Sequence, residues 1–145
     1  MNEKPCTERK ENWLECLQAQ GYRLTQPRRA VVDVLAQSQR ALNATEIFDL
    51  SREHYPSLGL VSVYRTLETL EKLNLIQRVH HPDGCQAYTA AFTGHQHLLI
   101  CQDCGHTEFF DGDDIASLVE KVESESGYRV QDHWLQLFGL CSRCQ

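Results

Sequence analysis

The chain has 145 residues, of which 41% are hydrophobic and 23% are charged, and its formal net charge is −6. This apolar content excludes wholesale disorder, and no apolar run reaches the roughly 18 residues that a membrane-spanning helix needs. The polar start, residues 1–11, has no apolar segment typical of a secretion signal. We therefore expect a cytoplasmic protein that does not bind membranes.

The charge is distributed unevenly along the chain. Residues 1–85 carry 11 basic and 11 acidic side chains, whereas residues 86–145 carry 3 and 9. The acidic excess belongs to the second half, so the first half can still present a basic face to nucleic acid. This difference suggests two domains with different roles, which we place at residues 1–91 and 92–145.

The first elements of the chain read as helices. Residues 12–20 have the apolar spacing of a short helix that ends at Gly21. Thr25 is a favourable N-cap for a second helix, and Pro27 is tolerated in its first turn because no partner exists there for an N–H. Apolar residues over 30–35 then recur with helical spacing.

Asn43 and Glu46 have the spacing of a capping box, which predicts a helix that continues to about His54. Ser62 begins a further amphipathic helix. Two short extended segments then flank the turn residues 82–84. Helices followed by a two-stranded hairpin predict a winged helix-turn-helix.

The second half alternates between strands and one helix. A hinge is expected at residues 92–94, followed by a helix over 115–122 that Gly127 closes. Strands are expected at 98–101, 107–110, 128–130 and 134–138. The whole chain is therefore predicted to be α+β, with an N-terminal winged helix-turn-helix domain followed by a small α/β domain.

The seven cysteines are an odd number in a chain with no export signal, which argues against a disulfide framework. Four form two Cys-x-x-Cys pairs: Cys101 with Cys104, and Cys141 with Cys144. Two such pairs complete a closed tetrahedral Zn–S₄ site, which is structural because no coordination position stays open. A redox dithiol or unrelated thiols are the alternatives. The remaining cysteines are treated as bystanders whose redox role stays open: Cys6, Cys16 and Cys85.

Histidines suggest a second metal site. In an extended segment, residues i and i+2 point to one side, so His95 and His97 can reach one ion. His133, on a later predicted strand, is a third candidate ligand. A fourth, acidic ligand is available from four residues: Glu108, Asp111, Asp113 and Asp114.

Ser62, Tyr64 and Arg65 lie at the start of the predicted recognition helix, the end that enters the major groove in helix-turn-helix proteins. Arg65 is suited to guanine, and Tyr64 to a thymine methyl group or a phosphate. Arg23 and Arg28 flank the start of an earlier helix, where basic residues contact phosphates.

An enzyme is not expected. A zinc hydrolase would need an open water position and a nearby base, and the sequence contains neither an H-E-x-x-H motif nor a glycine-rich phosphate loop. A protein-interaction module with a structural zinc is a further alternative. The predicted recognition helix and wing favour DNA binding over that alternative.

Five motifs together carry a resemblance: GYRLTQPR at 21–28, LVSVYRTL at 60–67, the His95-x-His97 pair, CxxCG at 101–105 and FGLCxxC at 138–144. From about residue 12 to the end, the chain resembles the ferric uptake regulator family of bacterial metalloregulators. The resemblance implies a homodimer that binds palindromic, A·T-rich operator DNA when loaded with a divalent metal. It implies repression of metal-uptake or stress genes and no small-molecule substrate beyond metal ions.

Residue by residue, the resemblance matches Tyr64 and Arg65 to the family's base-contacting pair and Arg23 to its minor-groove residue. It also matches the four paired cysteines to the family's structural zinc site. One sensory site of the family is not preserved, because its positions hold poor ligands here: Gln77, Ala91, Gln96 and Leu98.

The family's other site keeps its three histidines, but Ala116 stands where a glutamate is usual. Zinc-sensing members have a cysteine before that helix, at the position of Asp113, so Asp113 is the expected fourth ligand. Three imidazoles and a carboxylate favour Zn(II) over Fe(II) or Mn(II). A zinc uptake regulator is therefore expected first, and an iron-responsive or peroxide-responsive regulator second.

Overall fold

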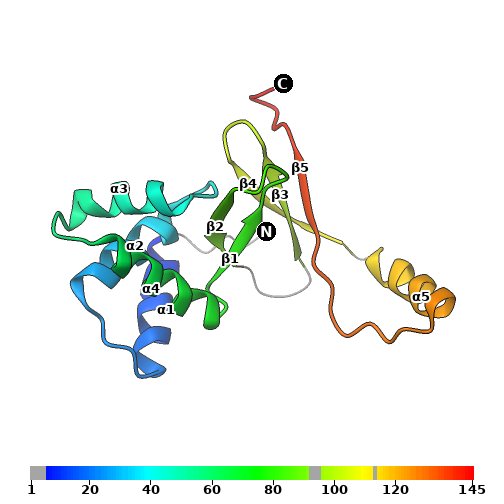
Figure 1. Ribbon diagram of the computed structural model, residues 1–145, viewed down its shortest axis with the longest axis horizontal. Coiled ribbons are helices and arrows are strands. Elements are labelled where there is room, and N and C mark those ends of the chain that lie inside the picture. Colours follow the sequence, from blue (N-terminus) through cyan, green and yellow to red (C-terminus); the bar gives the residue numbers. More distant parts are fainter. Residues whose placement is uncertain (1–5, 92–95, 113) are drawn as a thin grey trace. The chain divides into compact units, whose positions relative to one another are not determined.

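The computed structural model describes residues 6–91, 96–112 and 114–145, and the chain divides into two compact units, 1–91 and 92–145. The elements of the first unit are α1 (Cys6–Ala19), α2 (Gln26–Gln37), α3 (Ala44–His54), α4 (Leu60–Lys72), β1 (Ile76–His80) and β2 (Gln86–Ala90) (Figure 1). Those of the second are β3 (Gln96–Cys101), β4 (Thr107–Asp111), α5 (Ile115–Ser126) and β5 (Gln136–Gly139). The α+β fold class is confirmed.

The predicted helix caps are present. Thr25 Oγ1 accepts a hydrogen bond of 3.4 Å from the backbone N–H of Arg28 at the start of α2. At the start of α3, Asn43 Oδ1 accepts from Glu46 N at 2.8 Å, and Glu46 Oε2 accepts from Asn43 N at 2.9 Å. These side chains satisfy N–H groups that the first helical turn leaves without partners.

Two helices begin earlier than predicted. Helix α1 begins at Cys6 rather than at residue 12, so the polar residues at its start are helical although they break the apolar pattern. Helix α4 begins at Leu60 rather than at Ser62, because Gly59 in extended backbone is its N-cap. The earlier start of α4 adds Leu60 and Val61 to its first turn.

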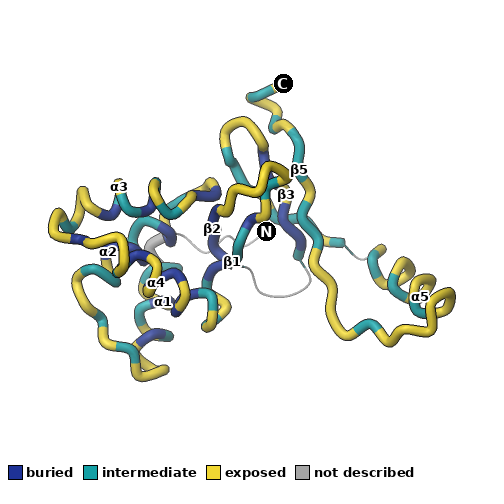
Figure 2. The backbone as a smooth tube through the Cα atoms, viewed as in Figure 1, coloured by how far each residue is buried: buried dark blue, intermediate teal, exposed yellow. Residues whose placement is uncertain are grey.

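The first unit has a continuous hydrophobic core to which all four helices contribute (Figure 2). Its fully buried side chains include Leu17, Val31, Ile47, Leu67 and Leu70. The loop before α3 joins the hairpin through two hydrogen bonds, Leu42 N to Tyr88 O at 2.9 Å and Tyr88 N to Leu42 O at 2.7 Å. This core fixes the buried side of α4 and leaves its other side on the surface.

The hairpin of the first unit is antiparallel and pairs Ile76 with Ala90 through to His80 with Gln86. Its turn lies at the predicted residues, 82–84. There, Asp83 Oδ1 accepts a hydrogen bond of 3.0 Å from Cys85 N. Helices followed by this hairpin make the predicted winged helix. Among the described residues, no helix combines the length and apolar character needed to cross a bilayer.

The second unit contains a three-stranded sheet in the order β4-β3-β5. Strand β3 is antiparallel to β4 and parallel to β5, with Cys101 opposite Gly139. Only four residues of the described part of this unit are buried: His97, Leu98, Ile100 and Cys101. No residue of α5 is buried, and Gly127, with φ of 74°, ends the helix as predicted.

Two strand predictions need correction. Residues 128–130 form no strand, and Val130 N instead donates a hydrogen bond of 2.6 Å to Glu123 Oε1. Strand β5 begins at Gln136, so His133 lies in the preceding loop rather than on a strand. The alternation of apolar residues was misleading, because Tyr128 and Trp134 are 76% and 62% exposed instead of facing a core.

Candidate metal centres and DNA-binding surface

The parallel pairing of β3 and β5 brings the two Cys-x-x-Cys pairs to one edge of the sheet. Cys101 ends β3, and Gln102 N donates a hydrogen bond of 2.8 Å to Gly139 O at the end of β5. Each pair then folds into a tight turn, with Cys144 N donating to Cys141 O at 2.9 Å in the second. Sequentially distant cysteines therefore meet because parallel strands end at the same edge.

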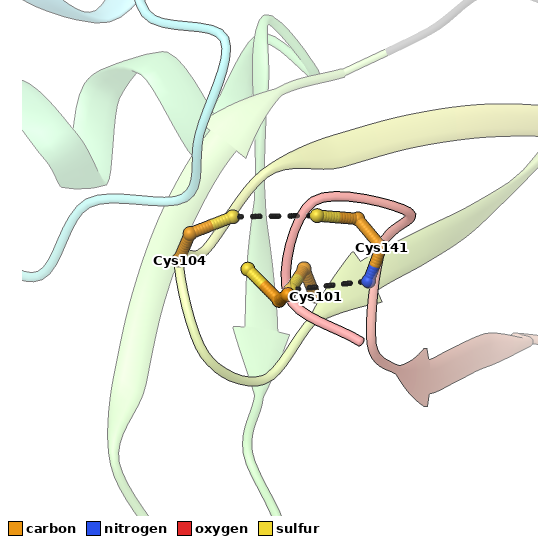
Figure 3. Close-up of side chains that lie close together, drawn as sticks. Cys101, Cys104 and Cys141 are labelled. Carbon is orange, nitrogen blue, oxygen red and sulfur yellow. Dashed lines mark hydrogen bonds between the residues drawn. The ribbon is translucent and has the colours of Figure 1, made fainter.

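The four sulfur atoms of Cys101, Cys104, Cys141 and Cys144 all lie within 4.8 Å of one another. Cys104 Sγ is 3.8 Å from Cys141 Sγ (Figure 3). A tetrahedral zinc with Zn–S bonds of about 2.3 Å places its sulfur atoms about 3.8 Å apart. The cluster thus has the composition and spacing of a Zn–S₄ site.

Backbone N–H groups stabilise negative charge in this cluster. Hydrogen bonds from the amides of Cys104 and Cys141 lower the pKa of the Cys101 thiol to about 6, and the Cys141 amide lies 3.4 Å from Cys101 Sγ (Figure 3). The amide of Arg143 lowers the pKa of Cys141. A hydrogen bond with Asp103 raises the pKa of Cys144. Backbone donors in the turns therefore favour the thiolate forms of Cys101 and Cys141, whereas Asp103 opposes the thiolate form of Cys144.

Within the described part of the second unit, His97 is the only buried polar residue. It is 5% exposed, and its Nε2 atom is buried with no hydrogen-bond partner among the described residues. Its ring centroid lies 5.6 Å from that of Phe110 and 5.3 Å from that of His133. A buried imidazole nitrogen without a partner calls for an explanation, such as an ion that it binds.

Gly112 makes room for the His97 ring, a role that the sequence alone did not reveal. A Cβ atom at residue 112 would lie 2.4 Å from His97 Cδ2 and 2.8 Å from Nε2, closer than real contacts allow. No motif of the sequence marks this glycine, which lies between two aspartates. A side chain here would displace the imidazole.

Two of the predicted regulatory ligands, His97 and His133, are close together in the structure. The other two, His95 and Asp113, lie outside the described residues. His133 is exposed, as is Asp114 at the start of α5. Within the described residues, the four cysteines are the only group of three or more metal-ligating side chains that converge.

Two other candidates for the fourth ligand, Asp111 and Glu108, lie on opposite faces of the sheet. Asp111 pairs with Gln96, whose Nε2 donates to Asp111 Oδ1 at 3.3 Å, and this pair faces away from His97 because side chains alternate along β3. Glu108 is on the His97 side, but its Oε1 lies 3.2 Å from His106 Nε2. Asp111 therefore lies on the face of the sheet opposite to His97, which disfavours it as the fourth ligand.

The outward face of α4 carries the predicted base-contacting residues. Tyr64 is 51% exposed and Arg65 is exposed, whereas Ser62 is half-buried. The carbonyl of Ser62 accepts a hydrogen bond of 2.8 Å from Thr66 Oγ1. The opposite face of α4 is buried in the core: Val63, Thr66, Leu67, Thr69 and Leu70.

The loop before α2 is tied down by one of the predicted phosphate-binding residues. Arg28 Nη1 donates a hydrogen bond to the carbonyl of Arg23, and its guanidinium lies 5.6 Å from the centre of the Tyr22 ring. Arg23 is exposed, whereas Arg28 is half-buried. Arg28 thus holds the backbone that presents Arg23, a contact that sequence spacing did not predict.

Comparisons with known proteins agree with this arrangement. The model of the ferric uptake regulator family matches residues 19–138. The ferric uptake regulation protein of Bacillus subtilis (strain 168) is 33% identical over 132 residues, covering 88% of this chain and 89% of the relative.

Two solved structures cover nearly the whole chain. The ferric uptake regulator of Helicobacter pylori, described with three functional metal binding sites, has a TM-score of 0.71 at 25% identity and covers 99% of this chain and 96% of its own. A zinc uptake regulator complexed with zinc and DNA has a TM-score of 0.76 at 20% identity and covers 98% and 96%. At that identity, the second likeness concerns the fold alone.

Proposed function

The chain belongs to the ferric uptake regulator family of metal-responsive transcriptional regulators, and we propose that it is a homodimeric repressor controlled by zinc. In this proposal, residues 1–91 bind palindromic operator DNA, and residues 92–145 dimerise and sense the metal. Metal-uptake genes are the expected targets, because a repressor that binds DNA when metal is abundant stops further uptake.

The observation that carries the proposal is the buried Nε2 atom of His97, which has no partner among the described residues and belongs to a ring beside His133. Leaving a buried polar atom unpaired costs about 1–3 kcal/mol, and a bound ion would remove that cost. Two further ligands would be His95, two residues before His97, and Asp113, at the position where zinc-sensing members of the family have a cysteine. Three imidazoles and one carboxylate suit tetrahedral Zn(II).

The ligands explain how a metal could control DNA binding. His95 lies close in sequence to the boundary between the two units, and Asp113 and His133 flank α5 and its following loop. One ion bound by all of these ligands would restrict movement at the boundary between the two units. It would thereby fix the distance between the two α4 helices of a dimer. Half-sites lie about one helical turn apart, so a fixed spacing favours binding by the metal-loaded protein.

The cysteine cluster supports a separate, structural zinc. Its four thiolates would hold the ends of β3 and β5 together and leave no position open for a substrate. This unit buries only four of its described residues, so a metal crosslink would supply stability that its core lacks.

The surface of the second unit supports dimerisation. It exposes large apolar side chains that a monomer would leave in water: Leu99, Leu118, Val122, Tyr128, Trp134, Leu137 and Leu140. Apolar surface of this extent on a small unit is typical of an interface. A second copy of the chain would cover it by two-fold symmetry, as in most homo-oligomers.

The test uses operator duplexes that the zinc-loaded protein selects from a random pool. We expect fluorescence anisotropy to show tight binding with Zn(II) and weak binding after the regulatory metal is chelated. His97→Ala should keep one zinc per chain and its dimeric state but lose the metal response. His54→Ala, which removes an exposed histidine of the first unit, is the matched control.

Each alternative has a distinct outcome. A larger response to anaerobic Fe(II) or to Mn(II) would replace zinc as the regulatory metal. An unchanged metal response in His97→Ala would move sensing elsewhere, with the wing residues His80, His81 and Cys85 next to be tested. Selection of no sequence at all would favour a protein-interaction module.

A further inference from the structure

The exposed apolar side chains of the first unit are concentrated at one place. In its described part, the large hydrophobic residues on the surface are Leu60, Val61 and Tyr64, which are 45%, 64% and 51% exposed. All three lie in the first two turns of α4. Exposed apolar residues are unremarkable when scattered, but a contiguous group indicates a contact surface.

Val61 occupies the centre of the outward face. With 3.6 residues per turn, Val61 shares that face with Tyr64, Arg65 and Glu68, all of which are exposed. Tyr64 and Arg65 flank it one turn further along the helix. Because Cβ atoms tilt toward the N-terminus of a helix, the Val61 side chain projects toward the end that enters the major groove.

The chemistry of this position points to thymine. The two methyl groups of valine neither donate nor accept hydrogen bonds, so they cannot read the polar edges of bases. Thymine alone among the DNA bases presents a methyl group in the major groove, where apolar side chains contact it. Arg65 beside Val61 and the absence of an acidic residue in this first turn suit DNA rather than a basic protein partner.

The opposite end of the same face is less suited to DNA. Glu68 is exposed one turn beyond Arg65, and its carboxylate lies 3.6 Å from Lys72 Nζ. A carboxylate near the phosphates would be repelled, so the charge pattern directs contact toward the first turn. Val61 is therefore placed where the helix approaches the base edges most closely.

We propose that Val61 determines operator specificity by contacting the 5-methyl group of one thymine in each half-site. The inference rests on the proposed function and deepens it, since it names a base feature that the recognition helix reads. It assigns Val61 a role beside Tyr64 and Arg65, and it predicts a requirement for thymine that uracil cannot satisfy.

The experiment replaces each thymine of the selected operator, one at a time, by deoxyuridine, which lacks only the methyl group. At one position per half-site, this change should weaken binding of the zinc-loaded wild-type protein about fourfold. That factor corresponds to the free energy gained by burying one aliphatic carbon group. Val61→Ala should lose affinity on the thymine operator and be insensitive to that replacement. Alanine is the best helix former, so α4 should remain folded.

Arg65→Ala is the matched control on the same face. It should weaken binding overall and still lose about the same factor on the deoxyuridine operator, because the methyl contact does not pass through the arginine. Equal sensitivity of wild type and Val61→Ala to every replacement would overturn the inference and assign methyl reading to another residue. If no replacement weakens the wild type, no methyl is read. Failure of the zinc-loaded protein to select any operator would instead remove the proposed function, and the inference with it.

Discussion

The two units of this chain differ in how much apolar surface each buries by itself. Of the buried hydrophobic residues in the described part, 19 belong to the first unit and three to the second, whereas seven of the ten exposed large hydrophobic residues belong to the second. The first unit can therefore fold around its own core. The second covers residues 92–145, and so short a segment rarely buries enough surface without a metal or a partner.

The largest expected effect is removal of one cysteine ligand from the second unit. Cys104→Ser should lose one tightly bound zinc per chain, because a structural zinc can contribute roughly 10 kcal/mol of folding free energy. The variant should become monomeric or aggregate, while hydrogen exchange of the first-unit helices stays protected. Metal analysis and gel filtration measure the outcome. Cys16→Ser is the control, and a stable Cys104→Ser dimer with full zinc content would contradict the proposed site.

The second test concerns a second copy of the chain, which is the other proposed source of stability for the second unit. Leu118 is 59% exposed on α5, and burying a leucine contributes about 1.5–3 kcal/mol. Because a two-fold interface contains two copies, Leu118→Asp should weaken the dimer by about 3–6 kcal/mol. Sedimentation at several concentrations measures this, with Glu120→Gln on the same helix as control. An unchanged dimer would place the interface away from Leu118.

A smaller effect is expected on the surface of the first unit. Arg65→Ala should cost about 1–3 kcal/mol in operator binding and relax base preference, since the arginine is exposed on α4. Arg23→Ala should instead lower the salt dependence of binding by about one unit for each protomer. Titrations at several salt concentrations separate the two. Wild-type affinity in Arg65→Ala would mean that α4 is not the recognition helix.

The smallest effects test the capping box of α3, which should matter only to the first unit. Asn43→Ala should cost about 1 kcal/mol of unfolding free energy, because it removes the hydrogen bond to the Glu46 amide. Urea unfolding at neutral pH measures this loss. Glu53→Ala, at an exposed position of the same helix, is the control.

Glu46 adds a pH dependence to the same cap. Burial alone would raise the pKa of this carboxyl, but hydrogen bonds from Arg40 and the Asn43 amide lower it below 4.5. A lowered pKa stabilises the fold above pH 4.5, and that contribution is lost as the pH falls through the folded value. Glu46→Gln should therefore flatten this part of the stability curve. A curve identical to that of the wild type would show that the box contributes nothing measurable.

The sequence was most informative where the signals were local. Thr25, Asn43 with Glu46, and Gly127 mark helix ends through contacts within a few residues, and the structure places each of them there. The strand predicted at residues 128–130 failed because alternation reports which side chains are apolar and not what covers them. A partner chain can cover such residues as well as a core can.

The sequence by itself determined the winged helix, the outward position of Tyr64 and Arg65, and the pairing of cysteines two by two, because helical period and Cys-x-x-Cys spacing are local properties. The sequence also predicted that the two pairs form one site, but only the tertiary structure decided how they meet: the parallel register of β3 and β5 brings Cys101 and Cys141 to one edge of the sheet. It also decided that His97 is buried without a partner beside His133. Burial and convergence depend on residues far apart in the chain, and local spacing does not encode them.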